Sequence, residues 1–163
     1  MKKKKQLLLA LSLLTCFLFS TVHVTAANES LGKVVDGSVL TDKSEVESTV
    51  YPWARGSYLS SGTGRVEVIS PGQVRVSGDT VAYQTVDEIK VTLYLQRLKS
   101  DESGWVHVAT LGPKTAKNTS MVTHSNTYSV AHGYYYRVQG AHTVIHKGNV
   151  ESATNYSDGI WVS

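Results

Sequence analysis

A two-residue alternation of apolar and polar side chains runs through most of the C-terminal two thirds of the sequence. It is clearest in residues 88–98, EIKVTLYLQRL, where the aliphatic residues occupy alternate positions: Ile89, Val91, Leu93 and Leu95. Successive side chains of a β-strand point to opposite faces, so this segment is expected to be a strand with one face in the core. No stretch has the 3.6-residue period of an amphipathic helix. The pattern therefore predicts an all-β protein.

Turn sequences separate the alternating segments at short intervals. They occur at residues 61–64, 70–73, 77–80, 100–104, 112–114, 131–133 and 155–159. Regularly spaced short strands favour an antiparallel β-sandwich, here of immunoglobulin or fibronectin character and spanning residues 51–163 as a single domain. One hairpin is expected around Pro71-Gly72. A longer hairpin is expected to join residues 88–98 to residues 104–111, with Val106 and Val108 completing its core side.

The segment GYYYRVQG contains three consecutive tyrosines beside an arginine. On a strand, Tyr134, Tyr136 and Val138 share one face, and the intervening Tyr135, Arg137 and Gln139 share the other. We expect the first set to point inward, because Val138 is the only aliphatic residue of the six. A strand that enters through a turn and begins with tyrosine is similar to the tyrosine corner of immunoglobulin-like domains, in which a buried hydroxyl bonds back to the turn.

The first 27 residues have the layout of a secretory signal. Four lysines precede an apolar run, and small residues follow at Thr25, Ala26 and Ala27. The run is short and contains several serines and threonines, which argues against a membrane span. Lipidation of Cys16 is not favoured, because Thr15 precedes it and the apolar residues FLF follow it. We expect cleavage near Ala27 and a secreted, extracellular protein with no stable membrane span.

Removal of such a signal changes the charge of the chain. Residues 1–27 hold four of the 16 lysines and arginines and none of the 13 acidic residues, so the remainder carries 12 basic and 13 acidic side chains. Nucleic-acid binding depends on a basic surface, and this balance argues against it. The single cysteine also lies within the signal, so disulfides are excluded. Residues 28–50 are polar and lack sustained periodicity, which predicts a flexible leader.

An aromatic and polar patch on the outer face of the sheet is the candidate binding site. If the two tyrosine-bearing strands are neighbours, the patch contains Tyr94, Gln96, Trp105, His107, Tyr135 and Arg137. Tyrosine and tryptophan tolerate half-exposed positions and are favoured at binding surfaces. The alternative is that these cross-strand pairs only stabilise the sheet.

Catalytic, metal and cofactor sites are not expected. His142 and His146 would lie on one face of a strand but about 13 Å apart, too far to share a zinc ion, so surface or loop positions are favoured for them. The serine-rich residues 57–64 lack the G-x-S-x-G order of an exposed nucleophile. The adjacent acids at 87–88 and 101–102 fall in expected turns rather than across a cleft.

Several motifs in fixed order resemble a known family. They are GSYLSSG at 56–62, VTLYLQRL at 91–98, GWVHV at 104–108, GYYYRVQGAH at 133–142 and YSDGIWV at 156–162. The chain is similar to a family of small secreted proteins of Gram-positive bacteria that is catalogued as a domain of unknown function. The resemblance implies export and a compact C-terminal β domain, and it supplies no catalytic or binding residues.

The function we expect is that of a non-enzymatic binding module at the cell envelope, with a glycan or an extracellular protein as partner. One alternative is a secreted antagonistic factor, bacteriocin-like or pore-forming, which would inhibit the growth of neighbouring bacteria. The other is a small hydrolase, which would lose activity when His107 or His142 is replaced.

Overall fold

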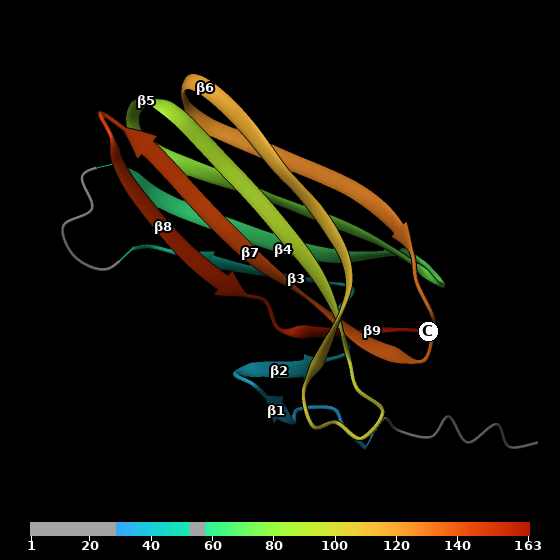
Figure 1. The fold of residues 1–163 in the computed structure, drawn as a ribbon. Coiled ribbons are helices and arrows are strands. Elements are labelled where there is room, and N and C mark those ends of the chain that lie inside the picture. Colours follow the sequence, from blue (N-terminus) through green and yellow to red (C-terminus); the bar gives the residue numbers. More distant parts are fainter. Residues whose placement is uncertain (1–28, 53–57) are drawn as a thin grey trace, which may run out of the picture.

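The computed structural model describes residues 29–52 and 58–163, and these residues form nine β-strands (Figure 1). The expected secretory signal lies outside the described residues. The strands are β1 (Val34–Val35), β2 (Ser38–Thr41), β3 (Glu45–Val50), β4 (Leu59–Ser70), β5 (Gln73–Leu98), β6 (Trp105–Ser129), β7 (Tyr134–His146), β8 (Asn149–Tyr156) and β9 (Gly159–Val162). The described part of the chain contains no helix, so the all-β prediction is confirmed.

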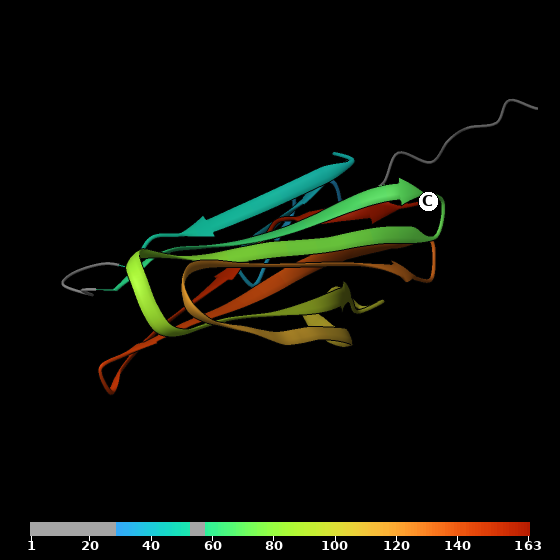
Figure 2. The same cartoon turned by 90° about the horizontal axis from the view of Figure 1, so that it is seen from above.

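The strands form one mixed sheet that curls over on itself (Figure 2). The strand order is β1-β2-β9-β7-β5-β4-β3, with β6 added beside β5 and β8 beside β7. All pairings are antiparallel except β2 with β9, which is parallel. The immunoglobulin-like sandwich is not confirmed, because the strands belong to one curled half-barrel rather than to two separate sheets.

Two long strands, β5 and β6, carry the curl. The first part of β5 pairs with β4, and its second part pairs with β7. The ladder between β5 and β6 is interrupted between Val81 and Val86. Such irregularities bend a strand, and here the bend brings the two halves of the sheet face to face (Figure 2).

Three of the expected turns instead lie inside strands. Residues 61–64 belong to β4, residues 77–80 to β5 and residues 112–114 to β6. Their glycines mark close packing or an unusual backbone angle rather than chain reversal. A methyl group on Gly78, for example, would lie 2.9 Å from Leu93 Cδ2 on the opposite half. The turn at Pro71-Gly72 is present as expected, with Gly72 at a φ of 68°.

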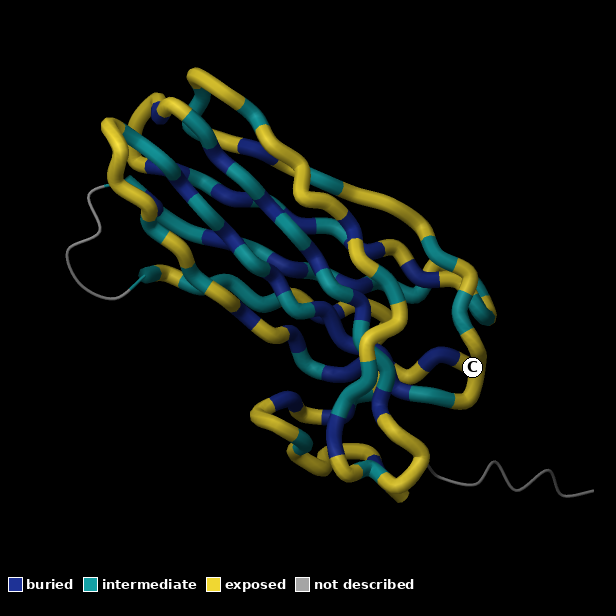
Figure 3. The backbone as a smooth tube through the Cα atoms, in the orientation of Figure 1, coloured by how far each residue is buried: buried dark blue, intermediate teal, exposed yellow. Residues whose placement is uncertain are grey.

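The core lies inside the curl and follows the predicted alternation. Leu93 and Val138 are fully buried, and buried positions alternate with partly exposed ones along the second half of β5 and along β7 after Val138 (Figure 3). Residues 135–138 of β7 are all buried, so both faces of the sheet are covered at this place. The partner strand differs from expectation, because a register shift between Leu95 and Gln96 leaves Val108 exposed. Beyond this shift, Leu111 takes the inward position instead.

Tyr136 forms the contact expected of a tyrosine corner. Its ring is buried in the core, and its hydroxyl donates a hydrogen bond of 2.6 Å to the main-chain oxygen of Ala131 in the preceding turn. Burial raises the pKa of this hydroxyl, which keeps it protonated as a donor. The corner is therefore confirmed, although the surrounding topology is not that of an immunoglobulin domain.

His142 is fully buried, contrary to the expected surface or loop position. Its Nδ1 lies 2.9 Å from Thr80 Oγ1 and its Nε2 lies 3.1 Å from Asn155 Oδ1, so both ring nitrogens have partners. Asn155 Nδ2 in turn donates to the main-chain oxygens of Ser48 and Gly62. Burial lowers the pKa of His142, which favours the neutral ring. The histidine therefore joins a satisfied polar group inside the curled sheet.

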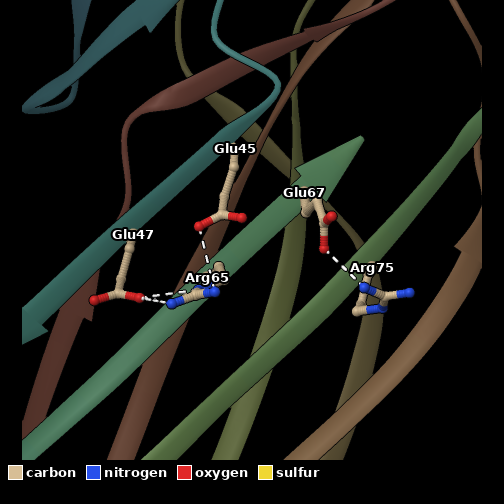
Figure 4. A network of polar contacts seen from close by, with 5 residues as sticks. All are labelled: Glu45, Glu47, Arg65, Glu67 and Arg75. Carbon is tan, nitrogen blue, oxygen red and sulfur yellow. Dashed lines mark hydrogen bonds and ion pairs between the residues drawn. The ribbon is translucent and has the colours of Figure 1, made fainter. Parts of the chain in front are cut away.

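Ion pairs cover the outer face of β3, β4 and β5 (Figure 4). Arg65 contacts Glu47 and lies 3.3 Å from Glu45, while Arg75 lies 2.9 Å from Glu67. The hydrogen bond with Glu47 raises the pKa of Arg65. These side chains are partly exposed, so each pair contributes little to stability, about 0–1 kcal/mol. Acidic residues on β3, an outer strand, also disfavour edge-to-edge association.

The expected flexible leader at residues 28–50 is wrong for the described part of that range. It contains β1, β2 and β3, and Leu40 in β2 is fully buried. β3 pairs with β4 along its length, and β2 pairs with β9 at the other end of the sequence. The segment looks like a leader in the sequence because its strands are short and their partners are distant.

Candidate functional site

The six residues of the expected patch lie on one face of the sheet. Directly paired residues in neighbouring strands share a face, and Gln96 pairs with Arg137 in β7 and with His107 in β6. The remaining members have the same parity, because Tyr94 pairs with Gln139 and Trp105 with Leu98. The required neighbourhood of β5 and β7 is therefore confirmed.

Arg137 is buried beneath the first two strands rather than exposed on this face, with only 5% of its surface accessible. Its Nη1 donates to Ser38 Oγ at 2.9 Å and to the main-chain oxygen of Asp36 at 3.2 Å, and its Nε donates to Gln96 Oε1 at 2.8 Å. Desolvation lowers its pKa. The arginine therefore clamps the β1–β2 hairpin onto the sheet.

Aromatic rings complete this clamp. The Arg137 guanidinium lies 4.5 Å from the ring centroid of Trp105 and 4.8 Å from that of Tyr156. Trp105 Nε1 donates to the main-chain oxygen of Val35 at 3.1 Å. Gly159 lets the indole pack closely, because a methyl group there would lie 2.9 Å from Trp105. Arg137 and Trp105 are thus occupied by the protein itself, which corrects the expectation that they form an open ligand surface.

The other part of the patch, formed by Tyr94, Gln96 and His107, remains at least partly accessible. Tyr94 and His107 form an edge-to-face pair with ring centroids 6.1 Å apart, and His107 is exposed. His107 Nε2 also lies 3.2 Å from Thr110 Oγ1. Gln96 Nε2 donates to Gln139 Oε1 at 3.0 Å. These contacts match the cross-strand pairing that was the alternative explanation of the patch.

Tyr135 differs from the other five residues of the patch, because its buried hydroxyl lacks a partner in the described part of the chain. Its side chain is almost wholly buried, with 2% accessible, and packs with Leu40 and Leu98. Its hydroxyl has no hydrogen-bond partner among the residues that the structure describes. Desolvation raises its pKa, and the carboxylates of Asp42 and Glu102 raise it further. A buried hydroxyl without a partner is costly, about 1–3 kcal/mol, and such groups in proteins call for a specific explanation.

Trp161 in β9 lies beside Tyr135 and is partly exposed. The two residues are direct partners in the β7–β9 ladder, and their ring centroids are 5.1 Å apart in an edge-to-face arrangement. Trp161 points away from the core, where its neighbours Ile160 and Val162 are buried. The aromatic pair therefore borders the solvent at the end of the sheet.

A hollow lies on each side of this pair, and both are lined by Tyr135 and Trp161. The first, the Glu102 hollow, measures about 380 Å³ and is also lined by Ser30, Lys99, Ser100, Glu102 and Tyr134. The second, the Asp42 hollow, measures about 430 Å³ and is also lined by Leu31, Asp42, Lys43, Ser44 and Ser163. The β5–β6 loop closes the first hollow against the N-terminal segment, because Glu102 accepts a hydrogen bond from Lys33 Nζ at 2.9 Å (Figure 1).

Sequence reasoning found Tyr135 but missed the rest of this site. The alternation in GIWVS places Trp161 opposite Ile160 and Val162, so its outward direction was available from the sequence. The sequence did not indicate that Asp42 lines a hollow beside Tyr135, because residues 28–50 show no pattern that reveals their long-range pairing.

Among the described residues, no three histidine, cysteine or acidic side chains come together as a metal-binding group. Across those same residues there is also no helix long and apolar enough to span a membrane.

Comparison with known proteins gives a family match and distant structural likenesses. The family described as "Family of unknown function (DUF6147)" matches residues 25–160, which confirms the resemblance to a family of unknown function. No curated protein matches the chain. Among solved structures, the sporulation control protein Spo0M from Bacillus subtilis matches with a TM-score of 0.35 and 12% identity. The match covers 74% of this chain and 51% of the Spo0M chain, so this chain corresponds to about half of that protein.

Proposed function

The chain belongs to DUF6147, a family of unknown function, and we propose that it is a non-enzymatic binding module that acts outside the cell, on envelope glycans or on a protein partner. Its binding surface is the Tyr135–Trp161 pair with the hollow on either side. The proposal of export is supported by the lysine-headed apolar segment of residues 1–27 and its small-residue end.

The unpartnered hydroxyl of Tyr135 is the observation that carries the binding proposal. Arg137, which is buried on the same strand, has hydrogen-bond partners, whereas Arg97 Nε on the neighbouring strand has none among the described residues, as is the case for the Tyr135 hydroxyl. An orphaned hydroxyl beside two hollows and a partly exposed tryptophan is the arrangement of a site that a ligand completes. Tyrosine and tryptophan are also the residue types that contribute most at binding surfaces.

The surroundings of the histidines support the non-enzymatic part of the proposal. His142 is enclosed in the core and hydrogen-bonded to neutral groups, so it has no access to a substrate. His107 contacts Thr110 and the ring of Tyr94, and neither residue would orient it as a general base.

Retention on insoluble cell envelopes tests the proposed function. The purified protein should co-sediment with envelopes of the producing organism, and Trp161→Ala should reduce the retained fraction at least about ten-fold, because a central aromatic contact is lost. Tyr83→Ala is the matched control, since Tyr83 is an exposed aromatic residue on β5 outside both hollows. Equal retention of Trp161→Ala and the wild type would remove this surface from consideration.

A growth-inhibition assay separates the binding module from an antagonistic factor. The purified protein should leave neighbouring Gram-positive cultures growing at their normal rate. Inhibition at the concentrations that saturate envelope binding would favour the antagonistic alternative.

A further inference from the structure

The two hollows beside the Tyr135–Trp161 pair offer nearly the same set of chemical groups. The Glu102 hollow contains a carboxylate, the amine of Lys99 and serine hydroxyls. The Asp42 hollow contains a carboxylate, the amine of Lys43 and serine hydroxyls. Each set combines hydrogen-bond acceptors with donors, and each pairs one acid with one base. Two similar sets of groups suit a ligand that is built from similar units.

The balance of charge in each hollow favours a neutral ligand. A strongly anionic ligand would meet the carboxylates of Asp42 and Glu102, whose field already acts on Tyr135. A cationic ligand would meet Lys43 and Lys99. The Glu102 carboxylate already accepts hydrogen bonds from Ser30 and Lys33. A neutral ligand that both donates and accepts hydrogen bonds matches the mixture of groups in the two hollows, and the hydroxyl groups of a saccharide have this property.

The aromatic pair supplies the apolar part of such a site. Trp161 is 36% exposed, so one part of its indole is packed and the other is open to a ligand. A ligand with an apolar face and polar edges suits an aromatic surface surrounded by hydrogen-bonding side chains. Tyr135 offers one hydroxyl donor and two acceptor positions that no described residue uses.

Backbone pairing at this place argues against an extended peptide as the ligand. A peptide strand is recognised through free main-chain groups at the edge of a sheet. Tyr135 and Trp161 are paired with each other in the β7–β9 ladder, and on the other side of β9 the strand β2 pairs with Gly159 and Ile160, directly before Trp161. Recognition here therefore falls to side chains, which suits a saccharide better than a strand.

From these observations we infer that the ligand is a neutral oligosaccharide, with one sugar unit in each hollow and the linkage crossing the Tyr135–Trp161 pair. Each hollow, at about 380 and 430 Å³, is near the lower end of the range for small-molecule sites, about 300–1,000 Å³. A single hollow therefore suits one small unit rather than a chain. This inference rests on the proposed binding function and names the class of its ligand.

Titration calorimetry with defined saccharides tests the inference. The probes are N-acetylglucosamine, its β-1,4-linked dimer and tetramer, and the β-1,4-linked glucose tetramer. At least one tetramer should bind about ten-fold or more tightly than a single sugar, because it fills both hollows. Trp161→Ala should abolish this binding, and Tyr135→Phe should weaken it about five- to ten-fold, as expected for one lost hydrogen bond. Tyr83→Ala should bind as the wild type does.

Competition on envelopes provides the second arm of the test. An excess of the free tetramer that binds in calorimetry should release the wild-type protein from envelopes, and protease treatment of the envelopes should leave retention intact. Retention that survives the free tetramer and is lost after protease would show a protein partner, which overturns the oligosaccharide while the binding module stands. Tetramer and single-sugar binding of equal strength would overturn the two-hollow arrangement. A protein that does not bind untreated envelopes would contradict the proposed function itself.

Discussion

The Nη1 of Arg137 donates a hydrogen bond to the main-chain oxygen of Asp36 at 3.2 Å, and this bond joins residues that are 101 positions apart in the sequence. Asp36 lies in the turn between β1 and β2, at a φ of 48°, and Arg137 lies near the start of β7. The bond therefore fixes an N-terminal hairpin to β7, which lies between β9 and β5 in the sheet. Because this hairpin covers Arg137, the arginine is buried although its side chain points away from the core.

Replacement of Arg137 by lysine should destabilise the protein by roughly 2–4 kcal/mol. Lysine keeps the charge but cannot stack between two rings or supply the same set of directed donors to Asp36, Ser38 and Gln96. Chemical denaturation measures the loss, and amide exchange should locate increased opening in residues 29–42. Arg65→Lys is the control and should change stability by less than about 1 kcal/mol, because its ion pairs are partly exposed.

The face on which each residue lies could be predicted from the sequence more reliably than its exposure. Two-residue alternation placed Leu93 and Val138 in the core and put Tyr94, Gln96 and Arg137 together on the other side. It could not show that a hairpin covers part of that side. The covering hairpin pairs with β9 through only two residue pairs, and such a distant pairing leaves no local pattern in the sequence.

The glycines illustrate the same limit in another way. A glycine within a short polar segment was taken to indicate a turn, yet Gly62 and Gly78 lie inside strands and face the opposite half of the curled sheet. Their role depends on which residues approach from far along the chain. Glycine at Gly72, where the backbone itself reverses, was predicted correctly because the requirement is local.

Replacement of Tyr135 by phenylalanine should leave the free energy of unfolding unchanged or raise it by about 1 kcal/mol. The substitution removes a buried hydroxyl that has no partner among the described residues and keeps the ring that packs against Leu40 and Leu98. Denaturant unfolding measures this effect. A loss of more than about 1 kcal/mol would mean that the hydroxyl is satisfied within the folded protein, and the argument for a ligand would lose its basis.

Replacement of Gly62 by alanine should destabilise the protein by about 1–3 kcal/mol. The added methyl group would overlap the buried ring of His142, which is held on both sides by Thr80 and Asn155 and has little room to move. Thermal unfolding measures the change. Ser60→Ala, two residues earlier on the same strand and only partly buried, should have a much smaller effect; equal effects would contradict the close contact with the ring.

Stability should fall as the pH is lowered from about 7 toward 5.5 because of His142. In the unfolded chain this residue takes up a proton near pH 6.5, whereas burial lowers its pKa in the folded protein and outweighs the opposing effects of Asn155 and Asp79. The unfolded state therefore binds more protons between the two pKa values, and unfolding becomes easier as the pH decreases through that window. At pH values above the pKa of His142 in the unfolded chain, the residue is neutral in both states and its full contribution to stability is present.

The variant His142→Gln tests this pH dependence through the slope rather than the absolute stability. Glutamine does not titrate, so the free energy of unfolding should depend less on pH between 7 and 5.5 in the variant than in the wild type. Identical slopes would show that another group is responsible for the dependence.

Replacement of Leu40 by alanine distinguishes a packed hairpin from a flexible leader. Leu40 is fully buried against Leu98 and Tyr135, and truncation of a buried leucine costs about 2–5 kcal/mol. A leader would give no change in unfolding at this position. Val34→Ala is the matched control on the same hairpin, because Val34 is 65% exposed and its truncation should cost less than about 0.5 kcal/mol. Since Leu40 supports the ring of Tyr135, Leu40→Ala should also weaken binding of the protein to envelopes. Val34→Ala should bind envelopes as the wild type does. A stable Leu40→Ala protein with unchanged envelope binding would contradict the role of the hairpin in the site.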